Sequence, residues 1–514
     1  MVREYLKKVL LELPSEKGTD MWTVDDAMKG IAILGGTGSG KTSASGKTIA
    51  LKFLREGWGG IVLCAKTGEA DLWKDYCKEA NRTNDLIVFS KGAVHQDEEF
   101  KGQQIVFNPI DYEMKREGDG AGETHNITNI FMNIYRMGNR IAGEGDTKEE
   151  RFWDSALKRC INRIVELIKL SGEDLTFKNM VRILAFDDEI DTNQIVDAAN
   201  YLESGGENEE EDTINLDSDS NYCLYCLAKA FLNLSSIDEK DERLIELESA
   251  YSLVYNYFAN EFNALGGRTK STIKESFMGL AEPFLSGLLS RHFSGKTNIF
   301  PEWTYKKHKI IVLDFSIKEY LDAGIISQCV FKMMFQQAIE RRKVSDYPVP
   351  VFLWADEAQY FINPYDQIFL TTARSSLTST VYLTQNISNY LSVLGSGSDS
   401  KAKVDSLLGN LCTKIFHANT DAETNEYASR LIGSDLIMIE TYGSTAQALS
   451  LNDSRNKGMA PQFLPQIFPK EFTELKTGGD ENQFEVQAIF MVSGKVWKDK
   501  KNFRRVTFKQ NFQN

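Results

Sequence analysis

Short apolar runs alternate with helical stretches along the first third of the chain. The runs are rich in Ile, Val and Leu, and the stretches between the early ones are as long as βαβ crossovers. This alternation predicts a parallel sheet with helices on its faces. The expected strands are Ile31–Leu34, Ile61–Ala65, Leu86–Phe89 and Ile105–Phe107.

The pattern changes after Asn108-Pro109. From about Asp111 to Pro301 the apolar positions follow helical periodicity, as in Phe152–Leu170 and Leu244–Phe262. We therefore predict an α/β domain, residues 1–110 and 302–514, interrupted by an inserted all-α domain, residues 111–301. The strands expected after the insertion are Ile310–Asp314, Val351–Ala355, Val381–Thr384, Lys414–His417 and Phe484–Met491.

Composition agrees with a folded cytosolic protein. Of the 514 residues, 42% are hydrophobic and 26% are charged, which is typical of globular chains. No stretch approaches the 18 apolar residues of a membrane-spanning helix, and the N-terminus lacks the features of a secretory signal. The odd number of cysteines, seven, argues against a disulfide framework. We expect a cytoplasmic location and no integral membrane segment.

The net charge of −14 arises largely from one segment. Thirteen Asp and Glu residues lie between Asp187 and Asp219, where there is no Lys or Arg, so the rest of the chain is almost neutral. A polyanionic ligand is therefore not excluded by the overall charge. We expect Ser204–Ser220 to be a solvated loop, and the alternative is a docking site for a basic partner.

The residues after Ile31–Leu34 match the phosphate-loop motif G-x-x-x-x-G-K-[ST], and a helix-compatible stretch follows to Phe53. Glycines let successive N–H groups point at a phosphate, and the next helix adds its positive N-terminal end. Lys41 is expected to reach the β- and γ-phosphates and Thr42 to ligate Mg²⁺. The chain lacks the guanine motif N-K-x-D, so the expected cofactors are ATP and Mg²⁺. The nucleotide-binding residues are predicted to be Gly35, Gly36, Thr37, Gly38, Ser39, Gly40, Lys41, Thr42 and Ser43.

Two carboxylates follow the apolar run Val351–Ala355. Asp356 fits the acid that fixes Mg²⁺ in P-loop enzymes, and Glu357 could polarise the attacking water. The alternative is an ordinary strand that ends at a charged turn. The phosphate loop elsewhere in the chain favours the catalytic interpretation.

Two further residues flank the expected strand Val381–Thr384. Gln385, at its end, could contact the γ-phosphate, and the alternative is an amide that caps backbone. Arg374 precedes the strand. In ring ATPases such an arginine often faces the neighbouring subunit's nucleotide, where it contributes about 10³–10⁵ in rate. The alternative is an ordinary surface arginine.

Together these motifs resemble the TraG/TraD coupling-protein family of conjugative type IV secretion, relatives of the FtsK and HerA motor ATPases. Beyond the phosphate loop, the likeness includes a K-G-E element at Lys66-Thr67-Gly68-Glu69, where Cys64 replaces the usual preceding Asp. It continues, in family order, through Phe107-Asn108-Pro109, Phe152-Trp153, Val312-Leu313-Asp314-Phe315, Ala355-Asp356-Glu357-Ala358-Gln359, Ala373-Arg374-Ser375, Leu383-Thr384-Gln385-Asn386 and Asp421-Ala422-Glu423-Thr424.

The resemblance implies a RecA-like motor that assembles as a ring, usually a hexamer, and moves DNA or a nucleoprotein through a central pore. The helical domain would receive cargo or a relaxosome-like partner. Members at the secretion channel generally carry N-terminal transmembrane helices, whereas this phosphate loop begins after 34 residues. A relative that acts on DNA in the cytoplasm therefore fits equally well, as does one held at the inner membrane through partners.

Three basic segments are candidates for contact with DNA phosphates, and the alternative for each is an ordinary solvated surface. They are Arg268–Lys270 with Lys274, Lys401–Lys403, and the C-terminal run Lys495–Lys509, which has seven basic residues and one acidic residue. Two rival functions remain open. One is a nucleotide-switched adaptor that recruits protein cargo through the helical domain, and the other is a protein-remodelling ATPase.

Overall fold

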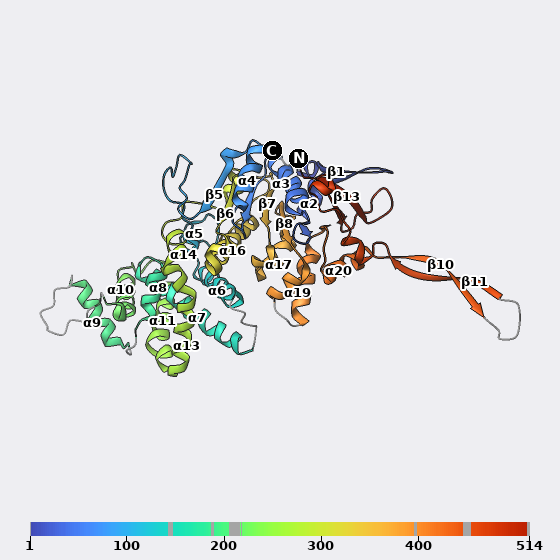
Figure 1. Cartoon of the computed structure of the whole chain (residues 1–514). Coiled ribbons are helices and arrows are strands. Elements are labelled where there is room, and N and C mark those ends of the chain that lie inside the picture. Colours follow the sequence, from blue (N-terminus) through green and yellow to red (C-terminus); the bar gives the residue numbers. More distant parts are fainter. Residues whose placement is uncertain are drawn as a thin grey trace. The chain divides into compact units, whose positions relative to one another are not determined.

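A computed structural model describes residues 2–141, 148–186, 190–204, 216, 218–394, 398–445 and 454–510. The chain forms two compact units (Figure 1). The first comprises Met1–Leu86, Thr304–Val312 and Arg342–Asn514, and the second comprises Ile87–Trp303 and Leu313–Arg341. The domain limits expected at residues 110 and 301 stay a prediction.

A mainly parallel sheet forms the core of the first unit. Strand β3 (Ile31–Leu34) pairs parallel with β8 (Thr378–Thr384) and β9 (Thr413–Phe416), β8 pairs parallel with β7 (Val351–Ala355), and β7 with β4 (Gly59–Leu63). Strands β12 (Glu485–Val492) and β13 (Phe503–Lys509) extend the sheet antiparallel. The α/β prediction of a RecA-like fold with a helical insertion is confirmed. The strand order is β13 (Phe503–Lys509), β12 (Glu485–Val492), β9 (Thr413–Phe416), β3 (Ile31–Leu34), β8 (Thr378–Thr384), β7 (Val351–Ala355) and β4 (Gly59–Leu63), followed by β6 (Ile310–Asp314).

The central strands are apolar because they are covered on both faces. Every residue of β3, β7 and β8 is buried, so their sequences read as continuous runs without the alternation of a half-exposed strand. This is why their positions could be predicted. The helices of this unit include α1 (Val2–Tyr5), α2 (Val24–Met28), α3 (Lys47–Arg55), α4 (Glu69–Glu79), α17 (Pro364–Thr372), α18 (Ile387–Leu394), α19 (Ser398–Asn410) and α20 (Ala422–Ile432).

The strand expected at Ile105–Phe107 is wrong. The backbone N–H of Ile105 donates a hydrogen bond to the carbonyl of Ala93, and that of Phe107 donates to the carbonyl of His292. The Val106 carbonyl accepts from Asn298. Because its partners are loop and helix-end residues, this apolar segment is held in place without joining a strand ladder. The other expected strands are present, with ends shifted by up to three residues, as in β8 and β12.

An N-terminal hairpin, which the pattern did not predict, precedes the phosphate loop. Strands β1 (Val9–Ser15) and β2 (Gly18–Thr23) pair antiparallel. Buried Asp20 accepts hydrogen bonds from the guanidinium of Arg504 in β13. The hairpin is thus tied to the C-terminal strand by a buried ion pair between residues far apart in sequence.

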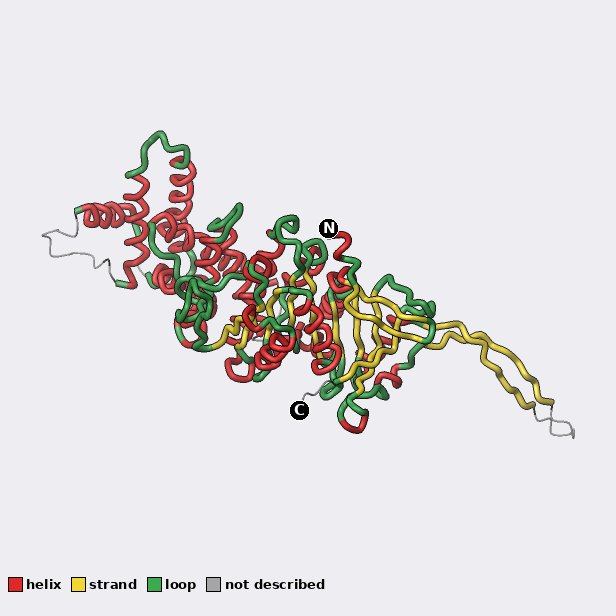
Figure 2. The backbone as a smooth tube through the Cα atoms, turned by 90° about the horizontal axis from the view of Figure 1, so that it is seen from above, coloured by secondary structure: helices red, strands yellow, loops and turns green. Residues whose placement is uncertain are grey.

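A long ribbon was also missed. Strands β10 (Ser434–Thr445) and β11 (Ser454–Pro465) pair antiparallel and extend away from the sheet of their unit (Figures 1 and 2). Several of its apolar side chains are exposed, so it lacks the buried face by which strands are usually recognised. The exposed ones include Leu436, Met438, Met459 and Phe463.

The second unit is mainly helical. Helix α7 (Lys148–Ser171) packs against α6 (Thr124–Ile141), α10 (Tyr222–Ser235), α11 (Leu244–Tyr255) and α13 (Gly267–Leu285). The Phe177 and Phe284 rings stack 4.1 Å apart in the core. The acidic segment expected as a loop, Ser204–Ser220, lies largely outside the described residues. The elements are β5 (Leu86–Ser90), α5 (Pro109–Lys115), α6 (Thr124–Ile141), α7 (Lys148–Ser171), α8 (Phe177–Leu184), α9 (Thr192–Glu203), α10 (Tyr222–Ser235), α11 (Leu244–Tyr255), α12 (Phe262–Ala264), α13 (Gly267–Leu285), α14 (Gly287–His292) and α16 (Ile317–Arg341).

Among the helices that the structure describes, none has both the length and the apolar character needed to cross a membrane.

Candidate nucleotide site

The phosphate loop runs from the end of β3 into a π-helical turn, η1 (Thr42–Gly46), which continues as α3. Gly38 and Gly40 have φ angles of 74° and 80°, a region that disfavours other residues. A Cβ on Gly40 would lie 2.6 Å from Val486, and one on Gly35 would lie 2.5 Å from the Ser39 hydroxyl. The loop therefore depends on glycine both for its backbone angles and for its close packing.

The loop residues fit a bound phosphate. The Ser39 hydroxyl is buried and has no hydrogen-bond partner, although a buried polar group normally has one. Lys41 is also buried at the start of the turn. A phosphate oxygen would satisfy the hydroxyl and neutralise the ammonium, which is the chemistry expected of a phosphate cradle.

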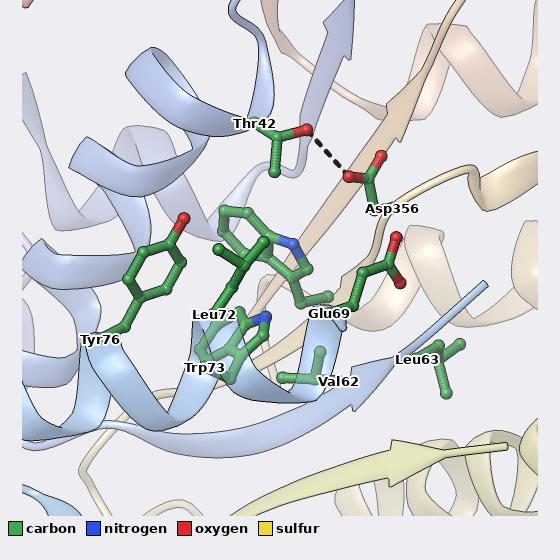
Figure 3. A pocket seen from close by; sticks show the side chains of 9 residues that line it. Thr42, Val62, Leu63, Glu69, Leu72, Trp73, Tyr76 and Asp356 are labelled. Carbon is green, nitrogen blue, oxygen red and sulfur yellow. Dashed lines mark hydrogen bonds between the residues drawn. The ribbon is translucent and has the colours of Figure 1, made fainter. Parts of the chain in front are cut away.

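Thr42 and Asp356 come together at the carboxyl edge of the parallel strands. The Thr42 hydroxyl donates to the Asp356 carboxylate over 2.9 Å (Figure 3). Hydroxyl and carboxylate oxygens are suitable Mg²⁺ ligands. The two residues predicted to hold the metal are therefore adjacent, and they fit the ion.

Glu357 is buried beside Asp356 in a left-handed backbone conformation, with φ 50° and ψ 49°. A non-glycine residue in this region is strained, and such strain is often found at functional sites. The Glu357 carboxylate accepts from Lys66 over 2.5 Å and from Gln385 and Gln359 over 3.0 Å each. Burial alone would raise its pKa, but these hydrogen bonds outweigh burial and lower the pKa to about 2.

Gln385 links the phosphate loop to Glu357. Its amide NH₂ donates to Glu357, while its amide oxygen accepts from the Thr37 hydroxyl over 3.3 Å. The residue predicted to contact the γ-phosphate thus bonds both to the loop that would hold the phosphates and to the carboxylate that would act on water.

A third acid, Glu69, lines a pocket with Thr42, Asp356, Trp73 and Tyr76 (Figure 3). One Glu69 carboxyl oxygen accepts from the backbone N–H of Ala65, and the other is buried without a hydrogen-bond partner. Burial, together with the charge of Asp356, raises the Glu69 pKa well above its usual value. In the sequence, only its place in the K-G-E element marked Glu69 as a residue of interest.

Arg374 is not brought to this cluster within one subunit. Arg374 precedes β8, whereas Gln385 follows this strand. The seven residues of β8, at roughly 3.3 Å each, place the two ends of the strand about 20 Å apart. The Arg374 guanidinium instead donates to Asp25 over 2.9 Å. Partial burial would raise the Asp25 pKa, but hydrogen bonds from Lys29 and from Arg374 outweigh it and lower the pKa.

The C-terminal strands contribute contacts to the loop that the sequence did not indicate. The Gln510 amide donates to the Ser43 hydroxyl over 2.8 Å. The Ser45 hydroxyl and His417 Nε2 lie 2.7 Å apart, and burial lowers the His417 pKa to about 3, so the ring is neutral. No local motif marks these residues, because only the sheet order brings β9 and β13 near the loop.

Several cations of the expected DNA-binding segments have intramolecular partners. In the C-terminal run, Arg504 pairs with Asp20, Lys495 with Asp26, and Arg505 with Glu471. Lys274 donates to the carbonyl of Phe186, and Lys401 lies 3.6 Å from Glu423. These contacts reduce the charge that each segment has available for phosphate.

Comparison with known proteins agrees with these features. Residues 350–466, which include Asp356, Glu357, Arg374 and Gln385, match the family model described as the TraM recognition site of TraD and TraG. No curated protein matches the chain.

Solved structures share the fold over nearly the whole chain. An unbound form of the bacterial conjugative coupling protein TrwBdeltaN70 has a TM-score of 0.56 and 12% identity, and the match covers 99% of this chain and 91% of that one. The plasmid coupling protein TrwB in complex with ADP and Mg²⁺ has a TM-score of 0.52, with 12% identity and the same coverage. The resemblance to the TraG/TraD coupling-protein family that the motifs indicate is thereby confirmed, by the family model over residues 350–466 and by the fold along the chain.

Proposed function

We propose that this protein is a Mg²⁺-dependent ATPase that works as a homo-oligomeric ring, of six subunits by family resemblance, and couples hydrolysis to the movement of DNA. The observation that carries the proposal is the convergence of Thr42, Asp356, Glu357 and Gln385 at one edge of the sheet. TrwB, which has the same fold, has been solved with ADP and Mg²⁺ and with a non-hydrolysable ATP analogue, which supports a nucleotide site in this chain.

In this proposal Gly35–Ser43 bind the phosphates and Lys41 neutralises them. Thr42 and Asp356 would hold Mg²⁺, which would supply positive charge to the phosphate oxygens when bound. Glu357 accepts a proton from the water whose oxygen attacks the γ-phosphorus, and the bond from that phosphorus to the bridging oxygen of ADP breaks. Gln385 orients this carboxylate relative to the loop.

Arg374 is assigned to the neighbouring subunit's site. Its position at the opposite edge of the sheet supports action in trans, because it cannot reach the nucleotide of its own subunit without a large rearrangement. The ring would surround DNA in a central pore. The helical domain, residues 111–301, would receive protein cargo or a relaxosome-like partner, and the protein would act in the cytoplasm or at the inner membrane through such partners.

The proposal is tested by measuring ATP hydrolysis by the full chain alone, with single-stranded DNA, with double-stranded DNA and with an unfolded polypeptide. Native mass spectrometry with a non-hydrolysable ATP analogue gives the subunit number. We expect DNA to stimulate hydrolysis and the analogue to support a ring. A rate unaffected by DNA would favour a nucleotide-switched adaptor, and stimulation by polypeptide alone would favour a remodelling ATPase.

A further inference from the structure

Lys66 occupies a position at the nucleotide site to which no role has been given. It follows β4 and precedes α4, and its ammonium lies 2.5 Å from the Glu357 carboxylate. The Lys66 side chain is 43% exposed, whereas that of Glu357 is 3% exposed. A half-exposed cation therefore reaches in to neutralise the buried carboxylate proposed to act on water.

This ion pair is connected to the phosphate loop. Lys66 and Gln385 donate to the same oxygen of Glu357, and Gln385 in turn accepts from Thr37. Asp356 is also close enough to Lys66 to raise the pKa of its ammonium, together with Glu357 and against the effect of burial. The ammonium thus faces the place where the terminal phosphate, Mg²⁺ and the attacking water would meet.

A terminal phosphate can compete for this cation. The phosphate carries more charge than a carboxylate, and the lysine ammonium binds it as a compact point charge. The flexible, partly exposed stem of Lys66 allows its head to shift without disturbing the core. A diphosphate has no group at that position and would leave the pair with Glu357 intact.

Building on the proposed function, we propose that Lys66 is a specificity-determining residue that recognises the γ-phosphate. It exchanges its ion pair with Glu357 for one with the terminal phosphate, so the site prefers triphosphate to diphosphate. The exchange also leaves the Glu357 oxygen that Lys66 occupied bonded to Gln385 alone, so this oxygen can accept a second hydrogen bond from the attacking water. The exchange breaks no covalent bond.

The test measures the affinities of a non-hydrolysable ATP analogue and of ADP, both with Mg²⁺, by calorimetry. Loss of one charged hydrogen bond predicts that Lys66→Gln lowers the preference for the analogue by about 10- to 100-fold while leaving the ADP affinity near that of the wild type. Lys66→Arg should keep most of the preference. Lys74→Gln, which removes a charge from the exposed side of α4 beside Asp71, should change neither affinity.

A second comparison covers the possibility that Lys66→Gln unfolds the chain by leaving Glu357 unpaired. Glu357→Gln removes the competing carboxylate, so it should bind the analogue at least as tightly as the wild type. The double variant that combines Lys66→Gln with Glu357→Gln has no unpaired charge. Its affinity for the analogue should be lower than that of Glu357→Gln by the same factor by which Lys66→Gln lowers the affinity of the wild type. An unchanged preference in both backgrounds would overturn the assignment of Lys66. Failure of the wild-type chain to bind either nucleotide would instead overturn the proposed function.

Discussion

A hydrogen bond of 2.9 Å joins the Thr42 hydroxyl to the Asp356 carboxylate across 314 positions of sequence. Thr42 begins the turn after β3, and Asp356 follows β7, with β8 lying between these two strands in the sheet. Because the three strands are parallel, their carboxyl ends meet at one edge. The sheet thus positions the phosphate loop beside the acid proposed to bind the metal.

Lys41→Ala should weaken nucleotide binding strongly, because the buried ammonium is the principal side-chain charge expected on the phosphates. We expect the affinity for a fluorescent ATP analogue to fall by about 100-fold and hydrolysis to fall with it. Lys52→Ala, which removes a lysine from the following helix α3, serves as the control and should bind normally. Normal turnover in Lys41→Ala would refute the phosphate-loop assignment.

Glu357→Gln should separate binding from chemistry. The amide keeps the shape of the side chain but cannot take up a proton, so turnover should fall by about 10²–10⁴ while the ATP affinity is retained. Phosphate release and equilibrium binding measure the two effects. Glu79→Gln, at the end of α4, is a matched change away from the site. Unaltered turnover in Glu357→Gln would remove Glu357 from the mechanism.

Arg374 should act across the subunit interface. Neither Arg374→Ala nor Lys41→Ala should hydrolyse ATP alone. A mixture should recover part of the activity, because some sites then combine an intact Lys41 with a neighbour's intact Arg374. Hydrolysis measured over a series of mixing ratios checks this. If no ratio restores activity, Arg374 does not act in trans.

Glu69 should make the stability of the nucleotide-free protein depend on pH. Its pKa is raised by burial and by Asp356, so its contribution to stability is fully present below about pH 4.5 and is lost as the pH rises toward about 8. Glu69→Gln should remove this loss, with a difference from wild type on the order of 1–3 kcal/mol between pH 5 and 8. Urea unfolding across this range measures it.

Asp71→Asn, a change at an exposed acid on the same helix, should keep the wild-type pH dependence. If the Glu69→Gln and wild-type curves ran parallel, the raised pKa would not be a property of the folded protein.

Arg504→Ala should destabilise the first unit strongly. It leaves the buried carboxylate of Asp20 without its charged partner, and breaking a buried pair typically costs about 3–5 kcal/mol. The neighbouring Arg505 pairs with Glu471 at the surface, so Arg505→Ala should cost at most about 1 kcal/mol. Thermal and chemical unfolding of both variants compare the two effects. Equal losses would show that the hairpin does not depend on Arg504.

The elements predicted correctly are those whose burial is reflected in the pattern of their own apolar residues. β3, β7 and β8 are buried on both faces, and their apolar runs revealed them. β10 and β11 expose apolar side chains and lack such a pattern, so the ribbon was missed. Ile105–Phe107 has the composition of a strand, but its hydrogen-bond partners are loop and helix-end residues elsewhere in the chain, which no local pattern encodes.

The sequence by itself determined the phosphate loop and the carboxylates after β7, because their chemistry requires particular residues at fixed spacing. Only the tertiary structure decided that Lys66 neutralises Glu357, that Gln385 joins this carboxylate to Thr37, and that Arg374 lies at the other end of β8. These relationships depend on which strands are neighbours and which edge they share. Strand order arises from packing across the whole sheet, and no short stretch of sequence specifies it.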